Sequence, residues 1–225
     1  MKFDFDYRSS DSSLVDFVWH TRSVGGGSFI SAASSNIEMV FTRQRDGMHV
    51  TVRGPETKAS PAPVPEDAEF LGITFKLGTF MPTLPTSELI DGGIHLPHAS
   101  NQSFWLHGSA WQFPDFENVD TFVNRLVRQG LLAREPVVEA VLQGQLTDLS
   151  ARSVQRRFVR VTGLTHGTLY QIERARRAML LLQKGVPILD TVEQIGYYDQ
   201  PHLTRSLKYY IGQTPAQLLD SSRSE

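Results

Sequence analysis

Five polar residues near the C-terminus have the side-chain chemistry to recognise a polyanion. They combine an amide, an imidazole, a hydroxyl, a guanidinium and an ammonium group: Gln200, His202, Thr204, Arg205 and Lys208. Such groups hydrogen-bond to base edges and bind phosphates in the major groove of duplex DNA. Taken alone, this polar face fits an ordinary amphipathic surface helix equally well.

A short helix is predicted to position these side chains. Asp199 is a suitable N-cap, and Pro201 is tolerated in the first turn because its missing N–H has no helical partner there. Gly212 and Pro215 would end the helix. The apolar residues recur at spacings of four and three on one face, which should be buried: Leu203, Leu207 and Tyr210.

A second segment has the same pattern. Ser150 is a candidate N-cap, Gly163 a candidate end, and Val154, Phe158 and Val161 form an apolar stripe between them. The residues that project from the other faces are mostly arginines, which suit bidentate contacts with guanine or phosphate: Arg152, Gln155, Arg156 and Arg160. Since 49 residues separate Phe158 from Leu207, we predict two helix-turn-helix units.

The match to a family pattern extends over some eighty residues. Its second half is carried by Ile188, Gly196-Tyr197, Asp199-Gln200, Leu203, Arg205, Leu207-Lys208, Gly212 and Thr214-Pro215. Its first half is carried by Ser150, Arg152, Val154, Gln155-Arg156-Arg157-Phe158 and Gly163, and the connection by Leu169-Tyr170, Arg174, Ala178 and Leu181-Leu182. Residues 135–219 thereby resemble the DNA-binding domain of the AraC/XylS (arabinose-regulator) family, in which a long helix joins two helix-turn-helix subdomains.

This resemblance implies a sequence-specific transcriptional regulator, activator or repressor, that reads successive major grooves with two recognition helices and is not an enzyme. The DNA-contacting residues would be Arg152, Gln155, Arg156 and Arg160 in the first helix, and Gln200, His202, Thr204, Arg205 and Lys208 in the second. We expect Gln200, His202 and Arg205 to read bases, and Lys208 to contact phosphate. In the joining helix, Leu169, Ile172, Met179 and Leu182 should be buried.

The sequence departs from the family at the Ile-Ala pair expected in the first helix of each subdomain. Thr191-Val192 stands there in the second subdomain and Gln143-Gly144 in the first. Because residues 144–149 look poorly helical, the leading helix of the first subdomain is instead predicted over residues 136–142, with Pro136 at its first position.

Charge is distributed unevenly along the chain. Residues 1–134 hold 11 Lys/Arg against 15 Asp/Glu, whereas residues 135–219 hold 10 against 7. The net charge of −2 therefore conceals a basic C-terminal part, as DNA binding requires. The absence of cysteine excludes disulfides, thiolate nucleophiles and Cys-based zinc sites. With no secretory or membrane-spanning apolar run, a cytoplasmic protein without membrane partners is expected.

The N-terminal half has strand-like alternation. Residues 37–41, 49–53 and 71–77 alternate apolar and polar side chains, and Asp46-Gly47 suits a hairpin turn between the first two segments. A proline-rich stretch, 55–65, is predicted to be a long irregular loop. The period then becomes helical, and an amphipathic helix should end near Gly130, with an apolar face of Val119, Phe122, Val123, Leu126 and Val127.

The predicted fold is α+β, with an N-terminal β-sandwich or barrel followed by the all-α double helix-turn-helix domain. The boundaries are 1–115 for a sensor or dimerisation domain, 116–134 for the connecting helix and 135–225 for the DNA-binding domain. Gly54-Pro55 and the Leu-Gly-Ile-Thr-Phe pattern from Leu71 resemble the degenerate cupin-like N-terminal domains that accompany this DNA-binding module. The expected partners are double-stranded DNA and, through the N-terminal domain, a small-molecule effector or a second copy of the chain.

The alternative function is a cupin-like enzyme or small-molecule carrier with a vestigial DNA-binding tail. A metal site would need closely spaced His and Glu ligands, but Pro97 interrupts the spacing of His95 and His98, His107 follows, and no Glu is suitably placed. No metal or cofactor is therefore expected. An aromatic set could line an effector pocket or form core, and the second is the more frequent role: Trp19, Phe104, Trp105 and Trp111.

Overall fold

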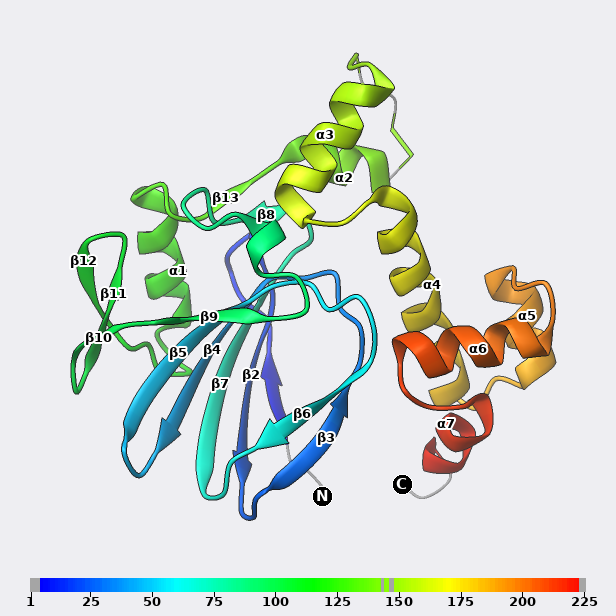
Figure 1. Cartoon of the computed structure of the whole chain (residues 1–225), viewed down its shortest axis with the longest axis horizontal. Coiled ribbons are helices and arrows are strands. Elements are labelled where there is room, and N and C mark those ends of the chain that lie inside the picture. The colour runs from blue at the N-terminus through cyan, green and yellow to red at the C-terminus, as the bar shows by residue number, and fades with distance from the viewer. Residues whose placement is uncertain (1–4, 143, 146–147, 223–225) are drawn as a thin grey trace. The chain divides into compact units, whose positions relative to one another are not determined.

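The computed structural model of the chain describes residues 5–142, 144–145 and 148–222, and shows a β-rich N-terminal region followed by a helical C-terminal region (Figure 1). It divides into two compact units. The first comprises Met1–Gly27, Asn36–Pro55 and Pro63–Thr165, and the second comprises Ser28–Ser35, Glu56–Ala62 and His166–Glu225. No helix within the described ranges has the length and apolar character needed to cross a membrane.

The first unit is built on a six-stranded antiparallel sheet. Its strand order is β1 (Phe5–Arg8), β2 (Val15–Ser23), β7 (Ala68–Phe75), β4 (Glu38–Gln44), β5 (Gly47–Arg53) and β9 (Gly93–Leu96). The predicted alternation is confirmed at Met39 and Phe41 of β4 and at Val50 and Val52 of β5, which are buried between half-buried neighbours. In β7 it is not, because Gly72 and Thr74 are buried as well as Leu71, Ile73 and Phe75. A cupin-like sandwich or barrel stays a prediction.

The hairpin between β4 and β5 differs by one residue from the prediction. Gln44 pairs with Gly47, so the two turn residues are Arg45 and Asp46 rather than Asp46 and Gly47. Gly47 is the first residue of β5 and has a φ of 137°, a conformation that only glycine adopts without strain. The glycine is therefore required beside the turn, not within it.

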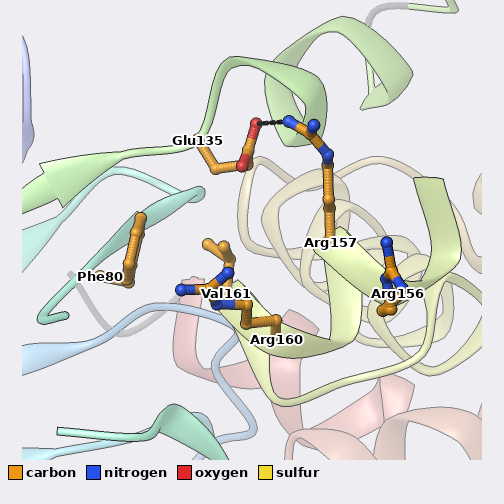
Figure 2. Close-up of a pocket in the computed structure, with 6 residues that line it drawn as sticks. All are labelled: Phe80, Glu135, Arg156, Arg157, Arg160 and Val161. Atoms are coloured by element: carbon orange, nitrogen blue, oxygen red, sulfur yellow. Dashed lines mark hydrogen bonds and ion pairs between the residues drawn. The ribbon is translucent and has the colours of Figure 1, made fainter. Parts of the chain in front are cut away.

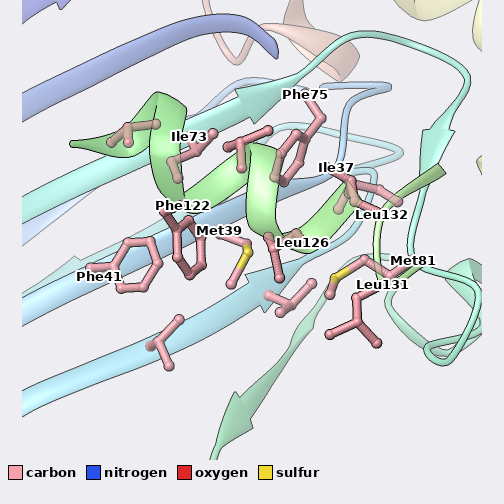
Figure 3. Close-up of a cluster of buried hydrophobic side chains, with 14 of the residues drawn as sticks. Ile37, Met39, Phe41, Ile73, Phe75, Met81, Phe122, Leu126, Leu131 and Leu132 are labelled. Carbon is pink, nitrogen blue, oxygen red and sulfur yellow. The ribbon is translucent and has the colours of Figure 1, made fainter. Parts of the chain in front are cut away.

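Helix α1 (Val119–Arg128) covers one face of this sheet (Figure 3). Its predicted apolar face is buried in the sheet core at Val119, Phe122, Val123 and Leu126, whereas Val127 is 37% exposed. Phe104 and Trp111 belong to the same core, which is the structural role weighed above for these aromatics. They come from β11 (Ser103–Leu106) and β12 (Ser109–Gln112), which form a small sheet with β10 (His98–Ser100).

The start of α1 is fixed to the edge strand by a partly buried carboxylate. Asp120 accepts hydrogen bonds from Ser10 and from Arg8, whose Nη1 lies 2.9 Å from the carboxylate. Partial burial raises the pKa of Asp120, but the Ser10 hydrogen bond and the Arg8 guanidinium lower it further. The net result is a pKa below the ordinary 3.8.

Asp120→Asn is expected to lower the free energy of unfolding at neutral pH by about 1 kcal/mol, because solvent screens a pair that retains partial exposure. A depressed folded-state pKa contributes stability that is present above pH 3.8 and is lost as the pH falls below it. Urea titrations at neutral pH and in acid should therefore show the deficit shrinking at low pH. The exposed Asp16 provides the control variant, Asp16→Asn; equal deficits for the two variants would contradict this role.

The remaining elements of the first unit position the first predicted recognition helix. Helix α2 (Pro136–Leu142) has the predicted bounds, and α3 (Ala151–Thr162) follows it. Strand β8 (Thr79–Phe80) pairs with β13 (Ala133–Arg134), and the 3₁₀ turn η1 (Thr86–Glu88) contacts α3. In this contact the Thr86 hydroxyl donates to the Val161 carbonyl oxygen at 2.9 Å.

The predicted proline-rich loop was wrong in part, because it contains a strand. Strand β6 (Ser60–Val64) pairs with β3 (Gly27–Ser31) in a two-stranded ribbon. Pro61 and Pro63 are exposed and alternate with the buried Ala62 and Val64. Proline is tolerated in an edge strand where its ring nitrogen faces away from the ladder, which allows this sequence to remain extended.

The second unit packs four helices around one core. They are α4 (His166–Gln183), α5 (Ile188–Ile195), α6 (Gln200–Tyr210) and α7 (Pro215–Ser222). In α4, Leu169, Ile172 and Leu182 are buried as predicted, whereas Met179 is only partly buried. At the departure from the family pattern, Thr191 is fully buried and Val192 half-buried.

Parts of the β3–β6 ribbon complete this unit. The ribbon residues that belong to this unit, together with the segments that follow β3 and precede β6, are 28–35 and 56–62. The amides of Ala33 and Ala59 donate to the carbonyl oxygens of Tyr210 and Tyr209, at 2.6 and 2.8 Å. Because the last carbonyls of a helix have no partner within it, the ribbon satisfies acceptors that α6 leaves open. Arg176 of α4 adds a bond from Nη1 to the Ala33 carbonyl at 3.2 Å.

Candidate nucleic-acid interface

The N-terminal end of α6 is built as the sequence predicts. Asp199 adopts an extended conformation and its Oδ1 accepts from the His202 amide at 2.7 Å, which is the N-cap bond. Pro201 occupies the first turn. Leu203 and Leu207 are fully buried in the core of the second unit, so the opposite face of α6 is turned outward.

Three of the five predicted contact residues on α6 are exposed: Gln200, Arg205 and Lys208. An ion pair with Asp199 would give Arg205 a structural role instead of a DNA-reading one. Within residues 148–222 no ion pair of Arg205 is found, and the Asp199 carboxylate is engaged as the cap. Thr204 is half-buried, and its hydroxyl donates to the Gln200 carbonyl oxygen at 2.9 Å.

His202 is oriented differently from its neighbours. Its ring is half-buried and stands perpendicular to the Tyr197 ring, with 5.1 Å between centroids. Its Nε2 lies 3.5 Å from Nη2 of Arg174 on α4. Base reading by His202 stays a prediction, and it would compete with these contacts.

The same contacts reveal a positioning group that the sequence reasoning missed. Arg174 is 9% exposed and its guanidinium lies 4.2 Å from the Tyr197 ring centroid, a cation–π arrangement. The Tyr197 hydroxyl in turn pairs with Ser206 of α6 at 2.9 Å. These three residues join α4 to the turn before α6 and to α6 itself. The sequence signal for this role was the position of Arg174, a charged residue among the apolar residues that α4 buries.

Helix α3 presents a comparable surface in the first unit. The Ser150 hydroxyl accepts from the Ser153 amide at 3.3 Å, and Gly163 ends the helix with a φ of 70°. Phe158 and Val161 are buried, as predicted. The predicted contact residues of this helix are all exposed: Arg152, Gln155, Arg156 and Arg160.

The histidines weighed as metal ligands do not form a metal-binding group. His98 Nε2 lies 3.2 Å from His49 Nδ1, and His95 Nδ1 lies 2.8 Å from the Thr51 hydroxyl. Across the described part of the chain, no group of three or more His, Cys, Asp or Glu side chains could hold an ion. Of the remaining predicted aromatics, Trp105 is 45% exposed and Trp19 lies over Gly72.

Comparison with known proteins agrees with this geometry. Residues 145–221 match the family described as "Helix-turn-helix domain", a range that contains both α3 and α6. No match was found among curated proteins or among solved structures. The C-terminal part of the chain is therefore similar to the AraC-type helix-turn-helix domain, which supports a DNA-binding regulator of transcription.

Proposed function

We propose that this protein regulates transcription by binding specific duplex DNA through α3 and α6, each inserted into a major groove. One observation carries the proposal. Gln200 is exposed at the capped first position of α6, and Arg205 is exposed in the second turn on the face opposite the buried leucines. The N-terminal residues of a recognition helix are those that contact base edges in helix-turn-helix proteins.

The first helix supplies the larger charge. Arg152, Arg156 and Arg160 follow one another at intervals of four, so they form one exposed row on α3. Such a row can bind phosphates along the backbone or read guanine in the groove. Reading of successive grooves by α3 and α6 is part of this proposal.

The β-rich part of the first unit would regulate this binding in the cytoplasm, through a small molecule or through association of two copies. Its sheet core is closed by α1, and its own loops hold α3. Any change in these loops would therefore reach the first recognition helix directly. Such a mechanism could produce either activation or repression of transcription.

Selection of genomic fragments with the purified full chain tests the proposal. The full chain is required because the ribbon, far from α6 in sequence, satisfies its C-terminal carbonyls. Recovered fragments are expected to share a sequence motif that spans two adjacent grooves. Recovery of fragments without a common motif would refute sequence-specific binding.

Lys208→Ala is expected to weaken binding of operator and scrambled DNA alike. Lys208 lies beyond the first turns of α6 and is exposed, where a cation reaches phosphate rather than bases. Loss of one phosphate contact should reduce the slope of log K against log salt by about one unit. Fluorescence anisotropy over a salt series measures this slope. The exposed Lys184, at the end of α4, provides the control Lys184→Ala, and an equal change for both variants would contradict the assignment.

A further inference from the structure

A cavity of about 520 Å³ lies in the first unit beside α3 (Figure 2). It is lined by Phe80, Glu135, Arg156, Arg157, Arg160 and Val161. Its volume falls within the range of about 300–1,000 Å³ that is typical of small-molecule sites. Half of its lining residues are arginines of α3, so the cavity is suited to a negatively charged ligand.

The walls of this cavity are held together by hydrogen bonds. The β8–β13 ladder pairs Phe80 with Ala133, and the Glu135 amide donates to the Gly78 carbonyl oxygen at 2.9 Å. The bond from Thr86 to the Val161 carbonyl fixes α3 on the other side. Because β8 is bonded to β13 and α3 is bonded to η1, the walls are held in place before any ligand arrives, which lowers the entropy cost of binding.

The charges lining the cavity do not balance. Arg157 Nη1 lies 3.4 Å from Glu135 Oε1, so one guanidinium is paired, as Figure 2 shows. The nearby Glu139 is engaged by Arg134 at 3.0 Å. Arg156 and Arg160 form no ion pair within the ranges that the structure describes. Two exposed guanidinium groups therefore remain available to an anion.

The other walls favour an organic body. Phe80 is half-buried and offers an aromatic ring, and Val161 of α3 is buried. In Figure 2, Arg160 extends toward Phe80 and Arg157 turns toward Glu135, whereas Arg156 lies on the far side of Arg157 from Phe80. An acidic group bound by guanidinium and an attached ring resting on Phe80 would use both kinds of surface.

We propose that this cavity binds a small organic anion, a carboxylate or a phosphate monoester carried on an aromatic ring. Arg160, which extends toward Phe80, would bind the acidic group, Arg156 would turn its side chain toward the same group, and Phe80 would contact the ring. The three arginines of the exposed row repel one another at i, i+4 spacing, and an anion between two of them would relieve that repulsion.

The consequence for regulation rests on the proposed function. Arg156 and Arg160 are also two of the α3 residues assigned to DNA. A ligand that engages them would withdraw two cations from the phosphates, so ligand and DNA should compete. Arg152 belongs to the row but does not line the cavity. A variant of Arg152 therefore distinguishes DNA binding from binding of the anion.

Isothermal titration of the full chain without DNA tests the site itself. Phenyl phosphate and phenylacetate serve as anionic probes, inorganic phosphate as an anion without a ring, and benzyl alcohol as a neutral ring. The two anionic aromatic probes should bind more tightly than the other compounds. Arg156→Gln and Arg160→Gln should each weaken them by about tenfold or more. Arg152→Gln should leave their affinity unchanged.

The outcomes separate this inference from the proposed function. Equal losses in Arg152→Gln, or benzyl alcohol binding as tightly as the anions, would overturn the anion site. So would absence of probe binding by a chain that still selects a DNA motif, which would leave the proposed function intact. Probe binding with the stated loss in Arg156→Gln and Arg160→Gln supports the site even if no DNA is selected. The tighter of the two aromatic probes identifies the acidic group.

Discussion

Arg205→Ala is expected to weaken operator binding by about 1–3 kcal/mol and to relax sequence preference at one base pair. The guanidinium is exposed in the second turn of α6, and it does not pair with the capping residue Asp199, whose carboxylate accepts from the His202 amide. A bidentate contact with guanine discriminates against other bases, whereas scrambled DNA offers only phosphate. Anisotropy titrations on operator and scrambled DNA should show the loss on the operator alone.

The neighbouring residues provide the comparison for this prediction. Gln200→Ala should behave as Arg205→Ala does, and Lys208→Ala should lose affinity for both DNAs equally. His202→Ala should also lower the melting temperature, since its ring packs on Tyr197 beside Arg174. If Gln200→Ala, His202→Ala and Arg205→Ala each weakened both DNAs equally, base reading by α6 would be refuted.

Local patterns predicted the central strands β4, β5 and β7 and the helices α1, α2, α3 and α6, whereas the other strands were not predicted. The alternation of Met39, Phe41, Val50 and Val52 marks strands with one buried face, and burial of these four residues confirms it. The helix starts were likewise encoded in single residues, because Ser150 and Asp199 cap α3 and α6 as the sequence indicates. Such signals need only neighbouring residues, which is why they can be seen without a structure.

Features that depend on distant residues were missed. Strand β6 was predicted as part of a loop because prolines usually interrupt strands, and its pairing partner β3 lies about thirty residues earlier in the chain. Nothing in residues 28–35 indicates that an amide there will bond to Tyr210. The arginine-lined cavity likewise combines Phe80 with residues of α3. Pairing and packing between such segments are set by tertiary structure.

For the candidate interface, the helix faces were predictable but the side-chain directions were not. Helical spacing places His202 on the polar face of α6, yet the residue lies at the boundary of that face, within reach of Tyr197. Whether a boundary side chain turns inward depends on what the neighbouring helix offers. Here α4 supplies Arg174, which no local pattern in α6 can indicate.

The ribbon makes Gly212 more sensitive to substitution than a helix-ending glycine normally is. Gly212 follows α6 with a φ of 81°, and an added Cβ would lie 2.4 Å from Cγ2 of Ile30 and 3.3 Å from Cβ of Ala59. Gly196 ends α5 with a nearly identical φ of 76°, but an added Cβ there meets nothing within 4 Å. The two glycines therefore share the backbone strain of substitution, and only Gly212 adds a clash with the ribbon.

Gly212→Ala is accordingly expected to destabilise the second unit more than Gly196→Ala, which should cost about 1–2 kcal/mol through left-handed strain alone. The clash should add about 1–3 kcal/mol. Hydrogen exchange of the Ala33 and Ala59 amides, which donate to the end of α6, reports the loosening locally. Their exchange should accelerate in Gly212→Ala and remain near the parent rate in Gly196→Ala. Ile30→Ala removes the clashing methyl group, so the double variant Ile30→Ala/Gly212→Ala should recover most of the added cost. Equal destabilisation by the two glycine variants, or no recovery in the double variant, would show that the ribbon does not constrain α6.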